Sequence, residues 1–257
     1  MTDKKNDIVV CGYPKSGTTW LSRLVAELVG CPFHGDLGYS DGRPLEGRGR
    51  ESDFDCYKSH RTLPSLATPG LHPRQKLIYI VRDPRDVAIS AAHHFRVNLF
   101  STVRSGNAVM AAMNTRLARI VPYAVKRNRM VRAVLYGDPS LSLWLGIPWR
   151  DHYGEFRRSD TLILKYEDLL DDPRAKCGEL LSYLGISRSE RLIADAISNQ
   201  SFEKKKAVFA SRGMTTEFAF LRKGSRGYWR SELGTKQKQL FRDEIGEELQ
   251  ALSYSLD

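Results

Sequence analysis

A stretch near the N-terminus constrains the fold of this chain most strongly. The apolar, β-branched run "DIVVCG" ends in Gly12, and "TTWLSRLVAELVG" then repeats leucine and valine at helical spacing. A short continuous apolar run is typical of a buried strand, whereas apolar residues three and four apart are typical of an amphipathic helix. Only a few polar and glycine residues separate the two runs, so the sequence predicts a strand, a tight loop and a helix.

The loop between them has the glycine frame of a phosphate-binding loop but a displaced lysine. Gly12 and Gly17 keep the G-x-x-x-x-G spacing, yet Thr18 follows Gly17 and Lys15 stands inside the loop. In a nucleotide-binding loop of the usual type, the lysine directly follows the second glycine. Backbone N–H groups and the dipole at the start of a helix bind anions. We therefore expect an anion site here, with a lysine that serves a different ligand.

Two further apolar runs are each followed by a helical pattern. "KLIYIV" precedes "DPRDVAISAAHHF", with Pro84 near its start, and "DTLILKYEDLL" leads into a helix from about Pro173 to Gly185. Residues 34–56 are rich in Gly, Asp and Arg, and we expect them to be mostly loop. The alternation predicts an α/β, P-loop-like fold in three layers, a central parallel sheet flanked by helices. We expect a single domain over residues 1–257.

The positive charge of the chain is concentrated in one segment. The net charge is +10, and residues 96–137 contain no Asp or Glu. The cations of this segment are Arg96, Arg104, Arg116, Arg119, Lys126, Arg127, Arg129 and Arg132. Its apolar positions have helical spacing, so we expect a basic helical cap inserted at about 96–150. Two interpretations stay open: a cap with a solvated arginine face, or an acceptor lid that attracts an anionic acceptor or a membrane surface.

Other features limit the class of protein. No apolar run approaches the roughly 20 residues that a membrane span needs. The start "MTDKKND" lacks the apolar core of a signal peptide, so we expect a cytoplasmic protein. The four cysteines, at positions 11, 31, 56 and 177, are far apart and form no metal-binding spacing, so we expect neither disulfides nor zinc.

Polar side chains that suit anions also stand elsewhere. Arg82 ends the second strand, and Ser90 lies on the helix after it. "RDPRD" alone fits a salt-bridged helix start equally well. In "KSH", Lys58 and His60 point to one face of an extended segment, and a histidine beside a lysine is held neutral, which suits a general base. "LRKGSRGYWR" places Arg222 beside a glycine turn. Four separate anion-facing elements fit a cofactor with two distant anionic groups.

The motifs "YPKSGTTW", "KSH", "VRDPRDVAIS", "KYEDL" and "RKGSRGYW" occur in an order and spacing that resembles the cytosolic-type sulfotransferases, from about residue 8 to 230. These enzymes use 3′-phosphoadenosine 5′-phosphosulfate (PAPS) as sulfuryl donor, release 3′,5′-adenosine bisphosphate (PAP) and require no metal. The resemblance implies that His60 is the catalytic base and that Lys15, Lys58 and Ser90 complete the catalytic set. It implies a donor site made of Lys15, Ser16, Gly17, Thr18, Thr19, Trp20, Arg82, Ser90, Tyr166, Phe202, Arg222, Lys223 and Gly224.

Two other classes of function fit the sequence less well than a sulfotransferase. A nucleotide kinase needs a lysine after Gly17 and an aspartate at the end of a later apolar strand, and neither is seen. A non-enzymatic membrane- or nucleic-acid-binding module leaves the phosphate-facing loops without a purpose, and no nucleic-acid motif is present. We expect a small-molecule, glycan or lipid acceptor with a hydroxyl or amine, anionic if the basic segment recruits it, and no nucleic acid. The oligomeric state and peripheral membrane contact stay open.

Overall fold

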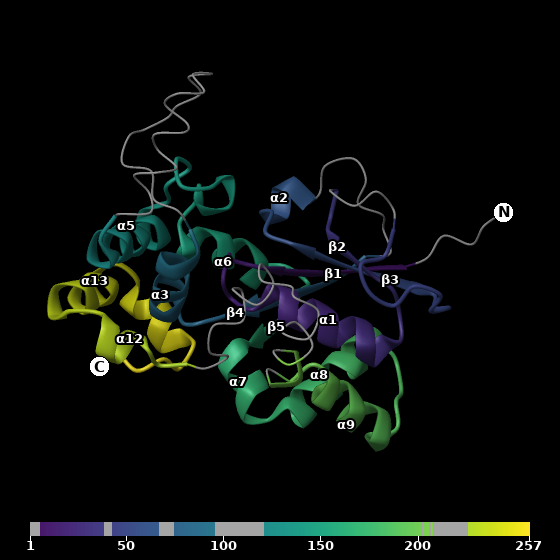
Figure 1. The fold of residues 1–257 in the computed structure, drawn as a ribbon. Coiled ribbons are helices and arrows are strands. Elements are labelled where there is room, and N and C mark those ends of the chain that lie inside the picture. The colour runs from purple at the N-terminus through teal and green to yellow at the C-terminus, as the bar shows by residue number, and fades with distance from the viewer. Residues whose placement is uncertain are drawn as a thin grey trace. The chain divides into compact units, whose positions relative to one another are not determined.

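The computed structural model of the chain describes residues 6–38, 43–66, 75–95, 121–201, 203–205, 207 and 226–257. The chain divides into two compact units, Met1–Arg82 with Glu155–Ser225, and Asp83–Gly154 with Arg226–Asp257. Figure 1 shows the elements of both units. The single domain expected over the whole chain stays a prediction.

A parallel sheet forms the centre of the first unit. Its strands are β1 (Asn6–Gly12), β2 (Phe33–Asp36), β3 (Phe54–Ser59), β4 (Lys76–Val81) and β5 (Leu162–Lys165). The five strands follow the order β2-β3-β1-β4-β5, and every pair is parallel. β1 is central and fully buried at Ile8, Val9 and Val10, as its continuous apolar run predicts. The predicted α/β fold with a central parallel sheet and flanking helices is confirmed.

Helices α1 (Thr18–Val29), α8 (Pro173–Leu184) and α9 (Glu190–Asn199) pack together on one face of this sheet, below it in Figure 1. α1 buries Leu21, Leu24 and Val25 against the strands. Gly30 ends α1 in the left-handed conformation that glycine adopts without a steric penalty. The short helices α2 (Leu63–Leu66) and α7 (Tyr166–Asp171) complete the first unit among the described elements.

Three predicted strands and their helices are confirmed as β1–α1, β4–α3 and β5–α7–α8, with α3 at Pro84–His94. The sequence did not predict β2 or β3, because it assigned residues 34–56 mostly to loop. β2 has only four residues and contains Gly35 and Asp36, which are both unfavourable in strands. β3 reads "FDCYKS" and has no continuous apolar run. Pairing with the central strand stabilises β3 where its own sequence does not.

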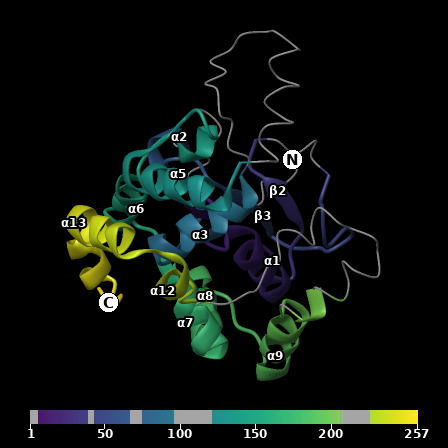
Figure 2. The same cartoon turned by 60° about the vertical axis from the view of Figure 1, so that its left-hand side comes forward.

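The second unit is helical in its described part. It contains α3, α5 (Tyr123–Tyr136), the 3₁₀ turn η1 (Leu143–Leu145), most of α6 (Trp149–Arg157), α12 (Trp229–Glu232) and α13 (Thr235–Ala251). α3 packs against α5, and α5 against α13, as Figure 2 shows. α5 lies within the segment that was expected to form the basic helical cap. The remainder of the predicted basic cap, residues 96–120, lies outside the described residues.

Buried ion pairs organise the start of α3. The Asp83 carboxylate caps the helix through the Arg85 N–H and forms two further hydrogen bonds with the Arg85 guanidinium, at 2.9 and 2.8 Å. That guanidinium lies 3.6 Å from the centre of the Trp229 ring. The Asp86 carboxylate accepts from the backbone N–H groups of Gly227 and Trp229. The salt-bridged helix start that "RDPRD" suggested is therefore present, and Asp86 also anchors the backbone from Gly227 to Trp229.

In the described part of the chain, no helix is long and apolar enough to cross a membrane. The four cysteines are buried free thiols.

Candidate active site

The site begins at one edge of the sheet. All five strands are parallel, so their carboxyl ends lie along the same edge, where α/β proteins bind ligands. The residues at or just after these ends are Asp36, Gly12, His60, Arg82 and Tyr166. Four of these five residues have polar or charged side chains, and three of them, His60, Arg82 and Tyr166, belong to the site that the sequence predicted.

The loop after β1 is held in an unusual backbone conformation. Lys15 has φ 72° and Gly17 has φ 100°, both in the left-handed region. For a residue other than glycine this conformation costs about 1 kcal/mol or more. A Cβ at Gly12 would lie 2.7 Å from Thr18 Oγ1, and one at Gly17 would lie 2.8 Å from the Tyr166 ring. Only glycine fits at either position, so both glycines of the frame are needed for the loop to close.

Two hydroxyl groups of this loop are buried without a partner. Ser16 is fully buried and Thr18 is 2% exposed. Among the described residues, neither Ser16 Oγ nor Thr18 Oγ1 has a hydrogen-bond partner. A buried polar group without a partner costs about 1–3 kcal/mol, which an acceptor-rich ligand offsets. Together with the start of α1, where Thr18 and Thr19 form the first turn, these donors suit a phosphate-type group.

Lys15 lies close to two other cations. Burial, followed by the charges of Arg82 and Lys58, lowers the pKa of Lys15 to about 8. Both causes disfavour the charged ammonium, and a bound anion would counteract both. A strained, desolvated lysine surrounded by positive charge is the arrangement expected of a functional group rather than of packing.

Arg82, Tyr166 and Trp20 contact one another in sequence beside the loop. The Arg82 guanidinium donates to the Lys15 carbonyl at 3.0 Å and lies 4.5 Å from the centre of the Tyr166 ring. Tyr166 meets Trp20 edge-on, with ring centres 5.7 Å apart. Trp20 is partly buried, and its Nε1 donates to the Gln200 carbonyl at 2.9 Å. These contacts fix the orientation of Trp20, whose ring the resemblance assigned to the adenine.

The end of β3 brings a lysine and a histidine to the same edge. Lys58 Nζ lies 3.0 Å from Asp36 Oδ2 at the end of the neighbouring strand. His60 Nδ1 lies 2.7 Å from the Gly12 carbonyl oxygen. A carbonyl can only accept, so Nδ1 carries the proton and the lone pair of the neutral ring is on Nε2. The loop that begins at Gly12 therefore also selects the tautomer that a general base at Nε2 needs.

Burial is the main reason why the pKa of His60 is lowered to about 4. The hydrogen bond to Gly12 opposes this shift, and the charge of Lys58 adds to it. The prediction that a neighbouring lysine keeps this histidine neutral agrees in direction, although burial contributes more than the lysine.

Two residues of this edge were not predicted from the sequence. Asp36 pairs with Lys58, but it lies in the stretch "HGDLG" that was assigned to loop. Gln200 is 2% exposed and binds Trp20 through its backbone carbonyl, which gives no signal in the side-chain pattern.

The remaining predicted site residues are placed differently. Ser90 is half-buried on α3 in the second unit, and its place with Arg82 in the donor site stays a prediction. Phe202, Arg222, Lys223 and Gly224 lie outside the described residues. Within the described ranges, no group of three His, Cys, Asp or Glu residues could hold a metal ion.

Known proteins resemble this chain over most of its length. The model of the sulfotransferase domain matches residues 48–253. Sulfotransferase 1A1 of Bos taurus is 24% identical over 266 residues, which cover 92% of this chain and 81% of that protein. Sulfotransferase 2A1 of Rattus norvegicus is 25% identical over 279 residues, which cover 96% of this chain and 86% of that protein.

Two solved structures have the same fold. Mouse sulfotransferase SULT7A1, complexed with PAP, superimposes with a TM-score of 0.68 at 21% identity, covering 95% of this chain and 84% of that one. Retinol dehydratase, in complex with androsterone and inactive cofactor PAP, gives a TM-score of 0.63 at 22% identity, covering 95% and 80%. The family model matches most of the chain, and the enzyme class predicted from the motifs is confirmed. The chain belongs to the sulfotransferase family.

Proposed function

We propose that this sulfotransferase transfers a sulfuryl group from PAPS to a hydroxyl or amine of a small acceptor molecule. Family membership supports the reaction class. The two solved structures with this fold, both complexed with PAP, support the donor. The observation that carries the proposal is the double use of one loop. The segment from Gly12 to Thr18 offers buried hydroxyl donors on one side and its Gly12 carbonyl to His60 on the other.

The residues of the loop suit the 5′-phosphosulfate end of the donor. Ser16 and Thr18 have buried hydroxyl groups with no partner among the described residues, and Gly17 lets the loop pack closely against the Tyr166 ring. Lys15 adds a positive charge beside them, and Thr19 adds a further hydroxyl in the first turn of α1. Each of these groups donates hydrogen bonds or supplies positive charge, as an anionic ligand requires.

The other end of the donor would lie against side chains further along the sheet edge. We assign the adenine to Trp20, with Tyr166 packed behind it. We assign the 3′-phosphate to Arg82 and Ser90. The predicted partners Phe202, Arg222, Lys223 and Gly224 belong to the same proposal on the strength of the motifs "SNQSFEKKK" and "RKGSRGYW".

When bound, PAPS supplies the sulfuryl group: a bond forms from the acceptor oxygen to sulfur, and the bond from sulfur to the bridging phosphate oxygen breaks. His60 takes the acceptor proton at Nε2, because Nδ1 is held by the Gly12 carbonyl. Lys58 and Lys15 stabilise the negative charge that develops on the transferred and leaving oxygens. These two lysines supply positive charge that a metal ion supplies in phosphoryl transfer.

The acceptor is proposed to be a small compound with a hydroxyl group. Among the relatives are a 3-beta-hydroxysteroid sulfotransferase of Cavia porcellus and the retinol dehydratase crystallised with androsterone. A glycan or lipid acceptor, contact with a membrane surface, and a cytoplasmic location remain proposals that rest on the sequence alone.

The test is binding and turnover with purified protein. Titration calorimetry should show PAP binding in the presence of EDTA, and radiolabelled PAPS should label a phenol or steroid alcohol in a substrate screen. The kinase alternative predicts instead that ATP binds more tightly than PAP and only with magnesium. That result, or the absence of PAP binding, would contradict the proposal.

A further inference from the structure

We propose that Glu27 is a positioning residue for the adenine end of the donor site, acting on Trp20 through Gln200. This inference rests on the proposed function, because it assumes that Trp20 contacts the base. Glu27 itself lies two helical turns from Trp20 on α1 and belongs to a polar network that the sulfotransferase motifs do not include.

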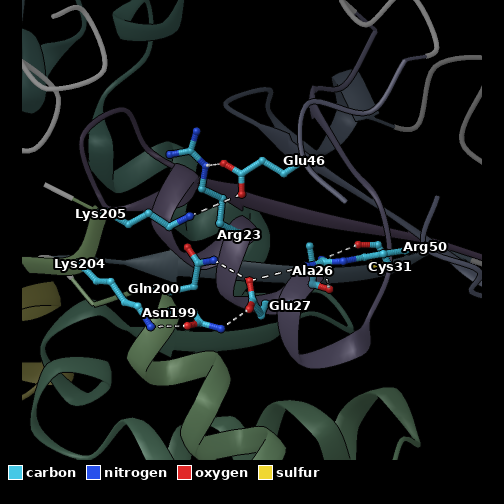
Figure 3. A network of polar contacts seen from close by, with 10 residues as sticks. All are labelled: Arg23, Ala26, Glu27, Cys31, Glu46, Arg50, Asn199, Gln200, Lys204 and Lys205. Atoms are coloured by element: carbon cyan, nitrogen blue, oxygen red, sulfur yellow. Dashed lines mark hydrogen bonds and ion pairs between the residues drawn. The ribbon is translucent and has the colours of Figure 1, made fainter. Parts of the chain in front are cut away.

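The contacts form a short chain from the carboxylate to the indole. Gln200 Nε2 donates to Glu27 Oε2 at 2.9 Å, and Asn199 Nδ2 donates to Glu27 Oε1 at 2.7 Å. The backbone carbonyl of Gln200 then accepts from Trp20 Nε1 at 2.9 Å. Figure 3 shows Glu27 between these two amides and Arg50. One residue, Gln200, is thus held at its side chain by Glu27 and at its carbonyl by Trp20.

Gln200 is attached to α1 at two points, its side chain at Glu27 and its carbonyl at Trp20. Trp20 and Glu27 are seven residues apart, which places them on the same face of a helix with 3.6 residues per turn. Gln200 follows the last residue of α9. If the Glu27 contact is lost, Gln200 is released at its side chain, and its carbonyl no longer has a fixed position for the indole N–H. The indole ring then loses a restraint on its orientation.

A carboxylate is specifically required at position 27. Both of its oxygens accept from amide NH₂ groups, which a neutral amide cannot do because one of its two ends is itself a donor. Gln200 is 2% exposed, so water cannot easily replace the lost contact. Arg50 Nη2 lies 3.7 Å from Glu27 Oε2 and, through Nη1, donates to the carbonyls of Ala26 and Cys31.

Glu46 provides a matched control within the same network. Its carboxylate lies 2.8 Å from Arg23 Nε and 3.6 Å from Lys205 Nζ. Through these two cations it connects α1 to the segment after Gln200, but no contact between Glu46 and Asn199 or Gln200 is present among the described interactions. Loss of the Glu46 carboxylate should weaken packing without altering the support of Trp20.

The experiment compares two ligands, PAP and ribose 3,5-bisphosphate, which lacks the base, by titration calorimetry. Because stacking of a base on an aromatic side chain contributes substantially to affinity, Glu27→Gln should weaken PAP binding by about tenfold. Binding of the base-free bisphosphate should stay within about twofold, because no adenine contact is involved. Glu46→Gln should leave both affinities within about the same twofold range. Equal losses for both ligands in Glu27→Gln would overturn the inference, since they would indicate a general structural role.

A second variant keeps the inference testable if Glu27→Gln does not fold. Trp20→Phe retains an aromatic ring but removes the Nε1 donor, so it should show the same selective loss for PAP. In a double-mutant cycle, Glu27→Gln should add little to Trp20→Phe, because both act through Gln200. Fully additive losses would contradict the proposed path. If the wild-type protein binds neither ligand, the proposed function fails instead, which separates the two outcomes.

Discussion

Two regions of the molecule are rich in cations, and they differ in the surroundings of those cations. At the carboxyl edge of the sheet, Lys15, Lys58 and Arg82 lie close enough that the latter two lower the pKa of Lys15. Lys15 has a left-handed backbone, and the hydroxyl groups beside it are buried without partners among the described residues. This region therefore brings three cations and two buried hydroxyl donors together around one loop.

Helix α5 is as basic in sequence but is paired within the second unit. Arg129 Nε lies 3.2 Å from Asp138 Oδ2, and its Nη2 donates to Ser140 Oγ at 2.8 Å. Arg127 donates to the backbone carbonyl of Glu232. The side chain of Arg132 stacks over Tyr136, 5.6 Å from the ring centre. The described part of the basic segment thus uses its cations to attach α5 to its surroundings.

The comparison shows that a high density of positive charge in a sequence is a weak indicator of an anion site. The segment 96–137 has the higher density, yet its described arginines have carboxylate, carbonyl or aromatic partners. The loop has a single lysine, but this lysine carries backbone strain and a desolvation penalty. Strain and unmet hydrogen bonds, rather than charge count, distinguish a site that needs a ligand.

The largest loss of activity is expected for a substitution of His60, which lies at the carboxyl edge of the sheet. His60→Asn keeps an N–H that can donate to the Gly12 carbonyl but cannot act as a base. We expect kcat to fall by about 10² to 10⁴, while the Kd for PAP changes by less than about threefold. Steady-state kinetics with labelled PAPS and calorimetry measure the two quantities.

His93, on α3 in the second unit, is the control for the substitution of His60. It stacks on Tyr123 with ring centres 4.6 Å apart, and its Nε2 lies 3.7 Å from Glu232 Oε2. His93→Asn should leave kcat within about threefold, since a surface-type ion pair contributes at most about 1 kcal/mol. Wild-type turnover in His60→Asn would remove His60 as the base.

The second effect is a loss of PAP affinity as the pH rises. Because the pKa of Lys15 is lowered to about 8, the ammonium loses its proton above this pH and no longer attracts the donor. We expect the Kd for PAP to increase by up to about tenfold per pH unit above that point. Lys15→Arg should abolish this dependence, because a guanidinium stays charged. The control Arg129→Met should retain it. The same slope in Lys15→Arg would show that another group is responsible.

The sequence predicted those strands of the sheet that have a continuous apolar run of their own. Continuous apolar runs predicted β1, β4 and β5, whereas β2 and β3 depend on pairing with strands distant in the sequence. Local propensity is overridden there by tertiary contacts.

For the candidate site, the sequence indicated best those residues whose side chains carry charge or titrate. Lys15, Lys58 and His60 do lie at the same sheet edge, and Arg82 contacts the loop through the Lys15 carbonyl. Gln200 could not be predicted, because its contact with Trp20 uses a backbone carbonyl that every residue possesses. The partnership of Asp36 with Lys58 required the register of a strand that the sequence did not reveal.

The smallest effect is on stability, and it has opposite signs in the two regions. A lysine with a lowered folded pKa binds fewer protons when folded than when unfolded, so it destabilises the protein fully below about pH 8, and this penalty disappears as the pH rises toward 10.5. Lys15→Met should therefore raise Tm at pH 7 by about 2–4 °C, the shift expected for about 1 kcal/mol in a protein of this size. Arg129→Met should lower Tm slightly, because Asp138 loses its partner. Differential scanning calorimetry at pH 7 and at pH 10 measures both changes, and the gain from Lys15→Met should shrink at the higher pH. A lower Tm for Lys15→Met at pH 7 would mean that the buried charge of Lys15 does not destabilise the folded protein, and the contrast between the two regions would then fail.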